Sequence, residues 1–371
     1  MSSLAMETGV SRTDWSAIKA PSALSVSEVP LDRWDAFAME FRDTVPDQTA
    51  AYATARWGAE RVRGLSVGDG SRSLGGALVI DFSLPLIGRG LSVVKFGPLW
   101  RRKGETAENR ALELVVSALQ RHVAGEGHKA LVILPLPDPA APDLLASTLL
   151  TAGFTRRGSI PNPERYCVNL GLDLDAQRAS LHSKWRYNLK QAQKAKLEIG
   201  LATGEAGLAS FMQLYGAMTE RKRFADHSSI DCLAAMMQAV QPEMRPEIVI
   251  VNHEGRPTAG AVISSFGDRA LYLFGATDDR ALPLHAGFAL QWWILEHLTN
   301  RGCLWYDLGG TEGDEGLARF KRHFVGNAGV VTDRLDEYAY AVDPVSRVIA
   351  SGVFALRGLQ RRRAQPVASA A

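Results

Sequence analysis

The sequence has few cysteines and no long apolar run. Only three of the 371 residues are cysteines, namely Cys167, Cys232 and Cys303. They are widely separated and lack zinc-ligand spacing, so we expect buried, reduced thiols and no zinc site. No apolar run approaches the roughly 20 residues of a membrane-spanning helix. The first residues also lack the basic and apolar regions of a signal peptide. These absences predict a soluble cytoplasmic protein.

Several catalytic signatures are also missing. The chain has no Gly-x-Ser-x-Gly elbow, no Walker A run and no Gly-x-Gly-x-x-Gly between a strand and a helix. Its eight histidines are scattered, without a His-Glu-x-x-His pattern. A metal hydrolase or a nucleotide kinase is therefore disfavoured, and no metal site is expected. The formal net charge is only +2, so a polyanion site would have to come from local clusters of basic residues.

What is present is an ordinary globular composition, with 46% hydrophobic and 22% charged residues. The length favours two domains. Hydrophobic patterning and turn residues predict the same order of elements twice, with strands followed by a helix, a glycine and a buried strand. The first set is expected at 76–82, 91–97, 111–122 and 130–135, and the second at 247–251, 259–265, 270–275, 289–298 and 303–308. This repeat predicts two similar α/β domains.

We divide the chain accordingly. The expected parts are a flexible N-terminus (1–25), a first domain (26–168), a second domain (169–345) and a basic helical or disordered tail (346–371). The tail is rich in arginine over residues 356–364. Two interpretations of it stay open, a frayed basic end and a weak contact with a membrane surface or RNA.

A basic segment over residues 180–196 has helical spacing. Trp185 and Leu189 belong to an apolar stripe that predicts a buried face, although Trp185 could instead stack on a base. No acidic residue neutralises the neighbouring cations, which could grip a phosphate or simply form a solvated face. The candidate phosphate-binding residues are Lys184, Arg186, Lys190 and Lys194.

A second basic segment, residues 316–324, is expected to form a short helix that follows a buried strand and a glycine turn. Ligands collect at the carboxyl ends of strands in α/β sheets. Lys321 could there stabilise the oxyanion of an acyl transfer, or it could be a surface lysine beside a buried Phe320. Strand alternation sends Tyr306 and Asp307 to opposite faces, so one of them should point into the interior.

The turn itself offers further candidates. Gly309 and Gly310 could let backbone N–H groups approach a ligand, or could simply permit the turn. Asp307 could orient this loop or accept a proton. We take Lys321 and Phe320 as candidate catalytic residues. Tyr306, Asp307, Gly309 and Gly310 are candidate substrate-binding residues.

Taken together, these segments resemble the FemAB family, tandem proteins of the N-acyltransferase (GNAT) fold whose best-known members add amino acids to peptidoglycan precursors. The similar stretches lie between about residues 165 and 340 and occur in the family's order, at 183–194, 274–277, 301–310 and 315–324. The first half matches only weakly, through Gln48, Trp57 and the Phe-Gly-Pro step at 96–98.

The resemblance implies two tandem GNAT-like α/β domains with mixed, mostly antiparallel sheets flanked by helices and a cleft between them. It implies acyl transfer to an amine, with aminoacyl-tRNA as donor in the peptidoglycan enzymes. The family's Phe-Lys pair corresponds to Phe320 and Lys321, so Lys321 would contact the tRNA end and stabilise the tetrahedral intermediate. This chain lacks the coiled-coil arm of some members. The family's first-domain lysine and acidic residue have only Lys95 and Asp138 as loose candidates.

The junction before the helix at 289–298 bears on the donor. Acyl-CoA enzymes of this fold bind pyrophosphate on a glycine-rich loop at a helix N-terminus, whereas residues 279–287 contain one glycine, Gly287. CoA is therefore disfavoured, and no resident cofactor is expected.

The expected function is an acyltransferase that moves an aminoacyl or acyl group to an amine of a cell-envelope precursor or small metabolite. Its expected partners are charged tRNA and the amine acceptor, with possible peripheral contact to a membrane-bound precursor. One alternative is an acyl-CoA-dependent N-acyltransferase in polysaccharide or lipid assembly. The other is a non-catalytic GNAT-like protein that binds a polyanion.

Overall fold

The computed structural model describes residues 24–364 except 71, 86, 162, 223–228 and 334. The strands of one sheet are β1 (Ser25–Val29), β2 (Val62–Gly68), β3 (Ser73–Ser83), β4 (Gly90–Lys95), β5 (Ala130–Leu134), β6 (Thr155–Ser159) and β14 (Asp336–Tyr340). Those of the other are β7 (Arg165–Asn169), β8 (Glu198–Ala202), β9 (Glu247–His253), β10 (Arg256–Ser264), β11 (Arg269–Thr277), β12 (Trp305–Asp307) and β13 (Val330–Thr332). The fold is therefore built on two sheets.

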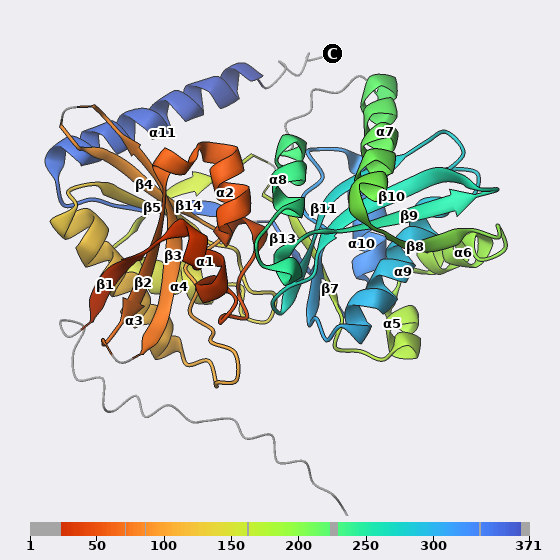
Figure 1. Ribbon diagram of the computed structural model, residues 1–371, viewed down its shortest axis with the longest axis horizontal. Coiled ribbons are helices and arrows are strands. Elements are labelled where there is room, and N and C mark those ends of the chain that lie inside the picture. The colour runs from red at the N-terminus through yellow and green to blue at the C-terminus, as the bar shows by residue number, and fades with distance from the viewer. Residues whose placement is uncertain are drawn as a thin grey trace, which may run out of the picture.

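The two sheets lie side by side, each flanked by helices (Figure 1). The first has the order β1-β2-β3-β4-β5-β14-β6 and the second β13-β7-β12-β11-β10-β9-β8. In each sheet one neighbouring pair is parallel, β4 with β5 and β11 with β12, and the other described pairs are antiparallel. The expected fold class, tandem α/β domains with mixed and mostly antiparallel sheets, is confirmed.

Helices cover both sheets. In the first half they are α1 (Leu31–Ala38), α2 (Ala50–Trp57), α3 (Asn109–Leu119) and α4 (Leu144–Thr151). Later in the chain come α5 (Leu174–Ser180), α6 (Ser183–Ala192), α7 (Gly204–Lys222), α8 (Leu233–Met237), α9 (Ala286–Asn300), α10 (Glu315–Val325) and α11 (Pro344–Ala364). Short 3-10 turns lie at Pro46–Gln48, Ala59–Arg61, Ile230–Cys232 and Pro242–Met244, and a π-helical stretch at Gln120–Glu126 continues α3.

Local sequence explains why α10 begins and ends where it does. Asp314 caps the first turn, its carboxylate accepting the Leu317 N–H at 2.9 Å. The helix ends at Gly326, which has φ 64°, and a Cβ there would lie 2.4 Å from the Ser180 carbonyl oxygen. Glycine is therefore required both by the backbone conformation and by the close approach of α5.

Sheet membership differs from the expected domain ranges at two places. β7 belongs to the second sheet although its first residues fall within the range 26–168, and β14 lies in the first sheet although it falls within 169–345. β14 is inserted between β5 and β6, where Tyr338 and Ala339 join the first domain's core. The residue pattern of a strand does not show which sheet the strand joins. Dividing the sequence at a single boundary therefore could not assign β14 to the first domain.

The basic tail is also part of the first domain. The expected tail, residues 346–371, lies on α11 as far as Ala364, and residues 365–371 and 1–23 are outside the described part. α11 packs on β4 and β5. The Ser346 hydroxyl fixes it, donating to the His128 carbonyl at 2.6 Å and accepting the Gly90 N–H at 3.2 Å.

The cores agree with the sequence patterning. Trp185 is 1% exposed and stacks on Phe324 with ring centroids 4.5 Å apart, in the same cluster as Leu189. The core interpretation of Trp185 is thus confirmed over stacking on a base. All three cysteines are buried and free, as expected.

We expect Trp185→Ala to lower the free energy of unfolding by about 3–5 kcal/mol, because it empties a large volume between α6, α9 and α10. Urea denaturation would measure this. Tyr187→Ala is the matched control, since Tyr187 is 62% exposed on the same helix and its loss should cost less than about 0.5 kcal/mol. Equal small losses for both variants would contradict the packing described here.

Candidate active site

The parallel strands β11 and β12 pair over a short stretch in the second domain. They pair only over Arg269–Leu271 and Trp305–Asp307. β12 ends there, whereas β11 runs on to Thr277. A bulge lies just past the paired stretch, because Val262 pairs with Phe274 and Ile263 with Tyr272, which leaves Leu273 as an extra residue. Bulges bend the strand that carries them. In the described residues, the side of β11 that faces β12 is therefore unpaired beyond Leu271, at the carboxyl end of β12, and we call this unpaired stretch the strand gap. Ligands collect at the carboxyl ends of strands in α/β sheets.

Lys321 of α10 lies in this gap. Its side chain is buried, with 6% of the residue exposed. The ammonium donates to the carbonyl oxygens of Leu308 at 2.6 Å and Gly310 at 2.5 Å, and lies 5.9 Å from the centre of the Tyr272 ring. The contacts therefore reach both strands: Tyr272 belongs to β11, and the two carbonyls follow β12.

The surroundings lower the pKa of Lys321. Burial is the main cause, Arg165 adds repulsion, and Asp307 and Glu312 act in the opposite direction. The resulting pKa is about 8, against an ordinary value of 10.5. At pH 7 the ammonium is therefore still mostly protonated, but it is held in a site that penalises the charge.

Asp307 lies beside this lysine at the centre of an ion cluster. It is fully buried, and its Oδ2 lies 2.8 Å from Arg165 Nη2 and 2.5 Å from Arg269 Nη2. Its Oδ1 accepts the Gly309 N–H at 2.8 Å. Burial alone would raise the pKa of Asp307, but the two arginines and the Gly309 N–H lower it to about 2. Asp307 is thus an ionised structural centre.

The ion cluster also joins the two domains. Arg269 donates to the Pro137 carbonyl at 2.6 Å, and Arg165 lies 5.6 Å from the centre of the Phe96 ring. Pro137 and Phe96 both follow strands of the first sheet. Asp307 therefore holds two arginines that contact the loops at the carboxyl ends of β4 and β5.

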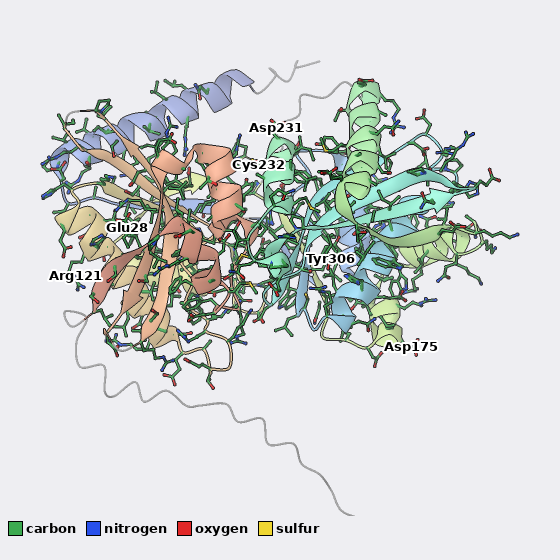
Figure 2. The ribbon with its side chains drawn as sticks, in the orientation of Figure 1. Glu28, Arg121, Asp175, Asp231, Cys232 and Tyr306 are labelled. Carbon is green, nitrogen blue, oxygen red and sulfur yellow. The ribbon has the colours of Figure 1, made fainter. Side chains whose placement is uncertain are left out.

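The structure corrects part of the expected binding set. Tyr306 is fully buried in the second domain's core, and its hydroxyl donates to Gln291 at 3.0 Å. Figure 2 labels it among the elements of that domain. Burial raises the pKa of Tyr306 well above its usual value. Alternation does send Tyr306 and Asp307 to opposite faces, but packing covers both, so neither side chain is exposed to a ligand.

The two glycines have different parts in the loop. Gly309 has φ 72°, and its N–H is already used by Asp307. This favours the turn interpretation for Gly309. Gly310 contributes its carbonyl oxygen to Lys321.

Four basic residues, Lys184, Arg186 and Lys190 of α6 and Lys194 in the turn after it, are all exposed, and we call them the α6 cations. Arg186 is used within the fold, since it donates to the carbonyls of Ala179 at 3.0 Å and Leu181 at 2.5 Å, at the end of α5. Beside Lys184, His182 stacks on His323 of α10 with ring centroids 3.8 Å apart. Burial lowers the pKa of His323, and His182 with nearby cations lowers it further. Basic groups of α6 and α10 thus share one surface.

An open pocket lies at the N-terminus of α9. It has about 820 Å³ of empty space, part of it open to solvent. Its lining comes from the end of β11, the following loop, α7, α9 and α10, namely Arg221, Thr277, Asp278, Asp279, Ala281, Leu282, His285, Gly287, Phe288 and Phe320. Phe320 packs against Phe288 with centroids 5.0 Å apart. Consecutive residues of α10 therefore line the pocket and occupy the strand gap.

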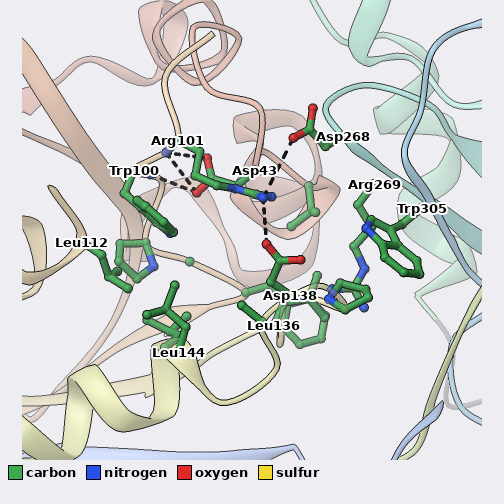
Figure 3. A pocket seen from close by; sticks show the side chains of 17 residues that line it. Asp43, Trp100, Arg101, Leu112, Leu136, Asp138, Leu144, Asp268, Arg269 and Trp305 are labelled. Atoms are coloured by element: carbon green, nitrogen blue, oxygen red, sulfur yellow. Dashed lines mark hydrogen bonds and ion pairs between the residues drawn. The ribbon is translucent and has the colours of Figure 1, made fainter. Parts of the chain in front are cut away.

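A second pocket lies between the domains (Figure 3). It has about 650 Å³ of empty space, including its mouth, and is bounded by Trp100 and Asp138 from the first domain and Trp305 from the second. Arg101 spans it, 2.8 Å from Asp138 and 3.9 Å from Asp268. Asp138, one of the two loose first-domain candidates, thus lies at a cavity.

The other first-domain candidate, Lys95, is paired with Asp47 at 2.8 Å. Burial would lower the pKa of Lys95, but Asp47 and Tyr52 raise it above its usual value. Within the residues that the structure describes, no three metal-ligating side chains gather, and none of the helices is both long and apolar enough to cross a membrane.

Comparison with known proteins adds to this geometry. Residues 178–322 match the family model described as an acetyltransferase (GNAT) domain. A crystal structure of FemX superimposes with a TM-score of 0.70 at 15% identity, covering 88% of this chain and 99% of that one. The chain therefore has the fold of that FemX structure, and its residues 178–322 are similar to a GNAT domain. The acyltransferase class expected from the sequence is thereby confirmed.

Other solved structures share this fold. One is titled L-PGS from Bacillus licheniformis, with a TM-score of 0.55 and 14% identity over 89% of this chain and 96% of that one. Another is the C-terminal domain of a putative lysylphosphatidylglycerol synthetase from Agrobacterium fabrum, with a TM-score of 0.53 and 13% identity over 87% and 95%. No curated protein sequence matches the chain.

Sequence reasoning missed three residues of this site, Arg165, Arg269 and Tyr272. Both arginines stand at the start of largely apolar strands, which was a usable signal that each needs a buried partner. Tyr272 carried no comparable signal, since an aromatic residue in a strand is ordinary.

Proposed function

We propose that the protein transfers an aminoacyl or acyl group from an activated donor to an amine, with Lys321 stabilising the oxyanion. The observation that carries this proposal is a buried ammonium in the gap between β11 and β12, next along α10 to a residue that lines an open pocket. The donor's reactive end would enter from the pocket at Phe320.

The chemistry follows from the three N–H donors of an ammonium. Two are directed at the carbonyls of Leu308 and Gly310, which fixes the direction of the third. The acceptor nitrogen attacks the donor carbonyl carbon, a C–N bond forms, and negative charge develops on the carbonyl oxygen. When that intermediate collapses, the donor's C–O or C–S bond breaks, the nitrogen loses a proton and the leaving group gains one. The third N–H of Lys321 would stabilise the charge where it develops.

Aminoacyl-tRNA is our preferred donor, with no resident cofactor. The cations of α6 are exposed and unneutralised along that helix, and they share a surface with α10, which carries Lys321. This surface suits a nucleic-acid backbone. An acyl-CoA remains the second candidate because the pocket at the N-terminus of α9 is a place where anions are favoured. Calorimetric titration with each donor separates them, and tight CoA binding without tRNA binding would exclude the preferred one.

The acceptor would be an amine of a cell-envelope precursor or of a small metabolite. The pocket between the domains is the candidate place for it, because Arg269 lines that pocket and also binds Asp307, beside Lys321. Its mixed lining of acidic, basic and aromatic side chains suits a polar acceptor with a flat or apolar part. Product analysis by mass spectrometry with candidate amines would identify it.

If tRNA is the donor, the α6 cations should control its salt dependence. The double variant Lys190→Ala/Lys194→Ala should bind charged tRNA more weakly and reduce the slope of log K against log salt by about 1–2. Lys103→Ala is the control, an exposed lysine of the first domain. An unchanged slope in the double variant would remove α6 from the donor site.

Turnover should fall as pH rises through about 8, because only the protonated Lys321 stabilises an oxyanion. Lys321→Arg should keep its charge and lack this decline.

The free energy of unfolding should change with pH in the opposite direction to turnover. Between about pH 8 and 10.5 the unfolded chain still holds a proton that the folded chain has lost, so the destabilisation caused by burying this charge is progressively removed as pH rises. Rates and unfolding curves measured on one pH series would separate the two effects.

A further inference from the structure

α11 has apolar side chains on two sides. Ala350, Ile349 and Phe354 pack toward the first sheet. Away from it, four aliphatic residues are exposed on a stripe that runs the length of the helix. They are Val345 (48%), Val348 (72%), Leu356 (63%) and Leu359 (55%), and we call them the outer stripe. Their spacing of three, eight and three residues keeps them on one face over about 20 Å of helix.

The β3–β4 hairpin extends this apolar surface. The Arg89 guanidinium lies 3.6 Å from the Asp343 carboxylate, and the neighbouring Gly90 N–H donates to Ser346 on the first turn of α11. Near this junction the hairpin exposes Leu84 and Ile87, 47% and 46% respectively. α11 runs along one side of the first domain with the hairpin beside its N-terminal end (Figure 1).

Exposed apolar residues are concentrated on these two segments. Of the 18 exposed large hydrophobic side chains found among the described residues, eight lie at positions 82–87 and 342–359. Single exposed apolar residues are normal on a monomer, whereas a contiguous group marks a contact surface. None of the eight lines either pocket of the candidate active site.

The charge of α11 indicates what this surface contacts. Over residues 344–364 the sequence contains five arginines and no acidic residue. Arg357 is paired with Glu337, whereas among the described residues the Arg347 side chain has a backbone carbonyl, that of Ala341, as its partner. Three more arginines follow in the sequence at 361–363. A second copy docked on this surface would bring like charges together. An anionic partner with an apolar interior would match both the stripe and the arginines.

We propose that the outer stripe and the β3–β4 hairpin form a peripheral binding surface for an anionic lipid bilayer. The aliphatic side chains would enter the boundary between headgroups and acyl chains, and the arginines would bind lipid phosphates. The helix would lie in the plane of the membrane. This inference does not depend on the transferase activity or on Lys321.

Vesicle co-sedimentation of the full chain tests this proposal. Binding is expected to phosphatidylcholine vesicles that contain about one-third phosphatidylglycerol, with little binding to pure phosphatidylcholine and weaker binding at high salt. The double variant Val348→Glu/Leu356→Glu should reduce the partition coefficient by at least about tenfold. Val240→Glu is the matched control, because Val240 is 72% exposed, as is Val348, but lies outside the surface.

Two results would overturn the proposal. One is wild-type protein that does not bind the anionic vesicles, or that binds them equally well after the double substitution. The other is sedimentation equilibrium showing a dimer that the double variant dissociates, because the stripe would then be an interface between copies. Circular dichroism of each variant checks that these exposed positions leave the fold unchanged.

Discussion

Replacing Lys321 with methionine should lower kcat by about 10²–10³-fold, the effect of losing one oxyanion donor. Methionine keeps much of the aliphatic stem of Lys321, so the packing of Phe320 on Phe288 and of Phe324 on Trp185 should persist. The third N–H, which we propose contacts the substrate, is lost together with the two that hold the Leu308 and Gly310 carbonyls. KM for the donor should change less than kcat, since the charge matters most in the transition state.

Two further variants separate catalysis from loop structure. Lys321→Arg keeps a cation and can still bind carbonyls, so it should preserve the thermal midpoint while recovering only part of the rate. Arg322→Met removes a neighbouring exposed cation of the same helix and should leave kcat nearly unchanged. Single-turnover rates with a saturating donor would measure all three. A Lys321→Met enzyme within about threefold of wild type would exclude the oxyanion role.

In the second domain, local sequence patterns predicted several of the helices and strands. Alternation and helical spacing predicted the strands near 247–275, the helix near 289–298 and the helix near 316–324, and the structure has β9, β10, β11, α9 and α10 there. Those predictions depend only on neighbours in the sequence. The adjacency of Phe320 and Lys321 is local too, which is why the pair could be singled out before its pocket was known.

The partners of Asp307 were not predictable in the same way. Arg165 is 142 residues away in the chain, and Arg269 reaches Asp307 only because β11 pairs in parallel with β12. Strand register is set by the whole sheet, so the sequence around Asp307 does not predict either contact. β14 presents the same difficulty, because its five residues read as a strand but do not specify insertion beside β5.

Replacing Asp307 with asparagine should lower the free energy of unfolding by about 3–5 kcal/mol, because it leaves two buried guanidinium groups without their shared carboxylate. Arg165 and Arg269 both contact Asp307 Oδ2, and the side chain of Arg269 is only 8% exposed. Water cannot readily replace the lost charge at such a site. Urea denaturation at pH 7 would measure the loss, and a change below about 1 kcal/mol would show that the cluster is not energetically coupled.

A double-mutant cycle with Arg269→Met tests the cause of that loss. If unpaired charge is responsible, Asp307→Asn should lower the free energy of unfolding less in the Arg269→Met background than in the wild type, because one of the two unpaired guanidinium groups is then absent. Equal costs in the two backgrounds would instead point to lost packing or to the Gly309 N–H, which also contacts Asp307.

The lowered pKa of Asp307 also predicts how the stability of the fold changes in acid. Its folded pKa of about 2 lies below the ordinary 3.8, so its stabilisation is complete above about pH 4 and is lost as pH falls toward 2. Asp307→Asn should lack that increment of acid sensitivity. It should also lower the pKa of Lys321 further, because Asp307 is one of the two groups that raise it. The decline of turnover with pH should therefore begin below pH 8 in this variant, whereas a decline unchanged from wild type would separate the ion cluster from the lysine.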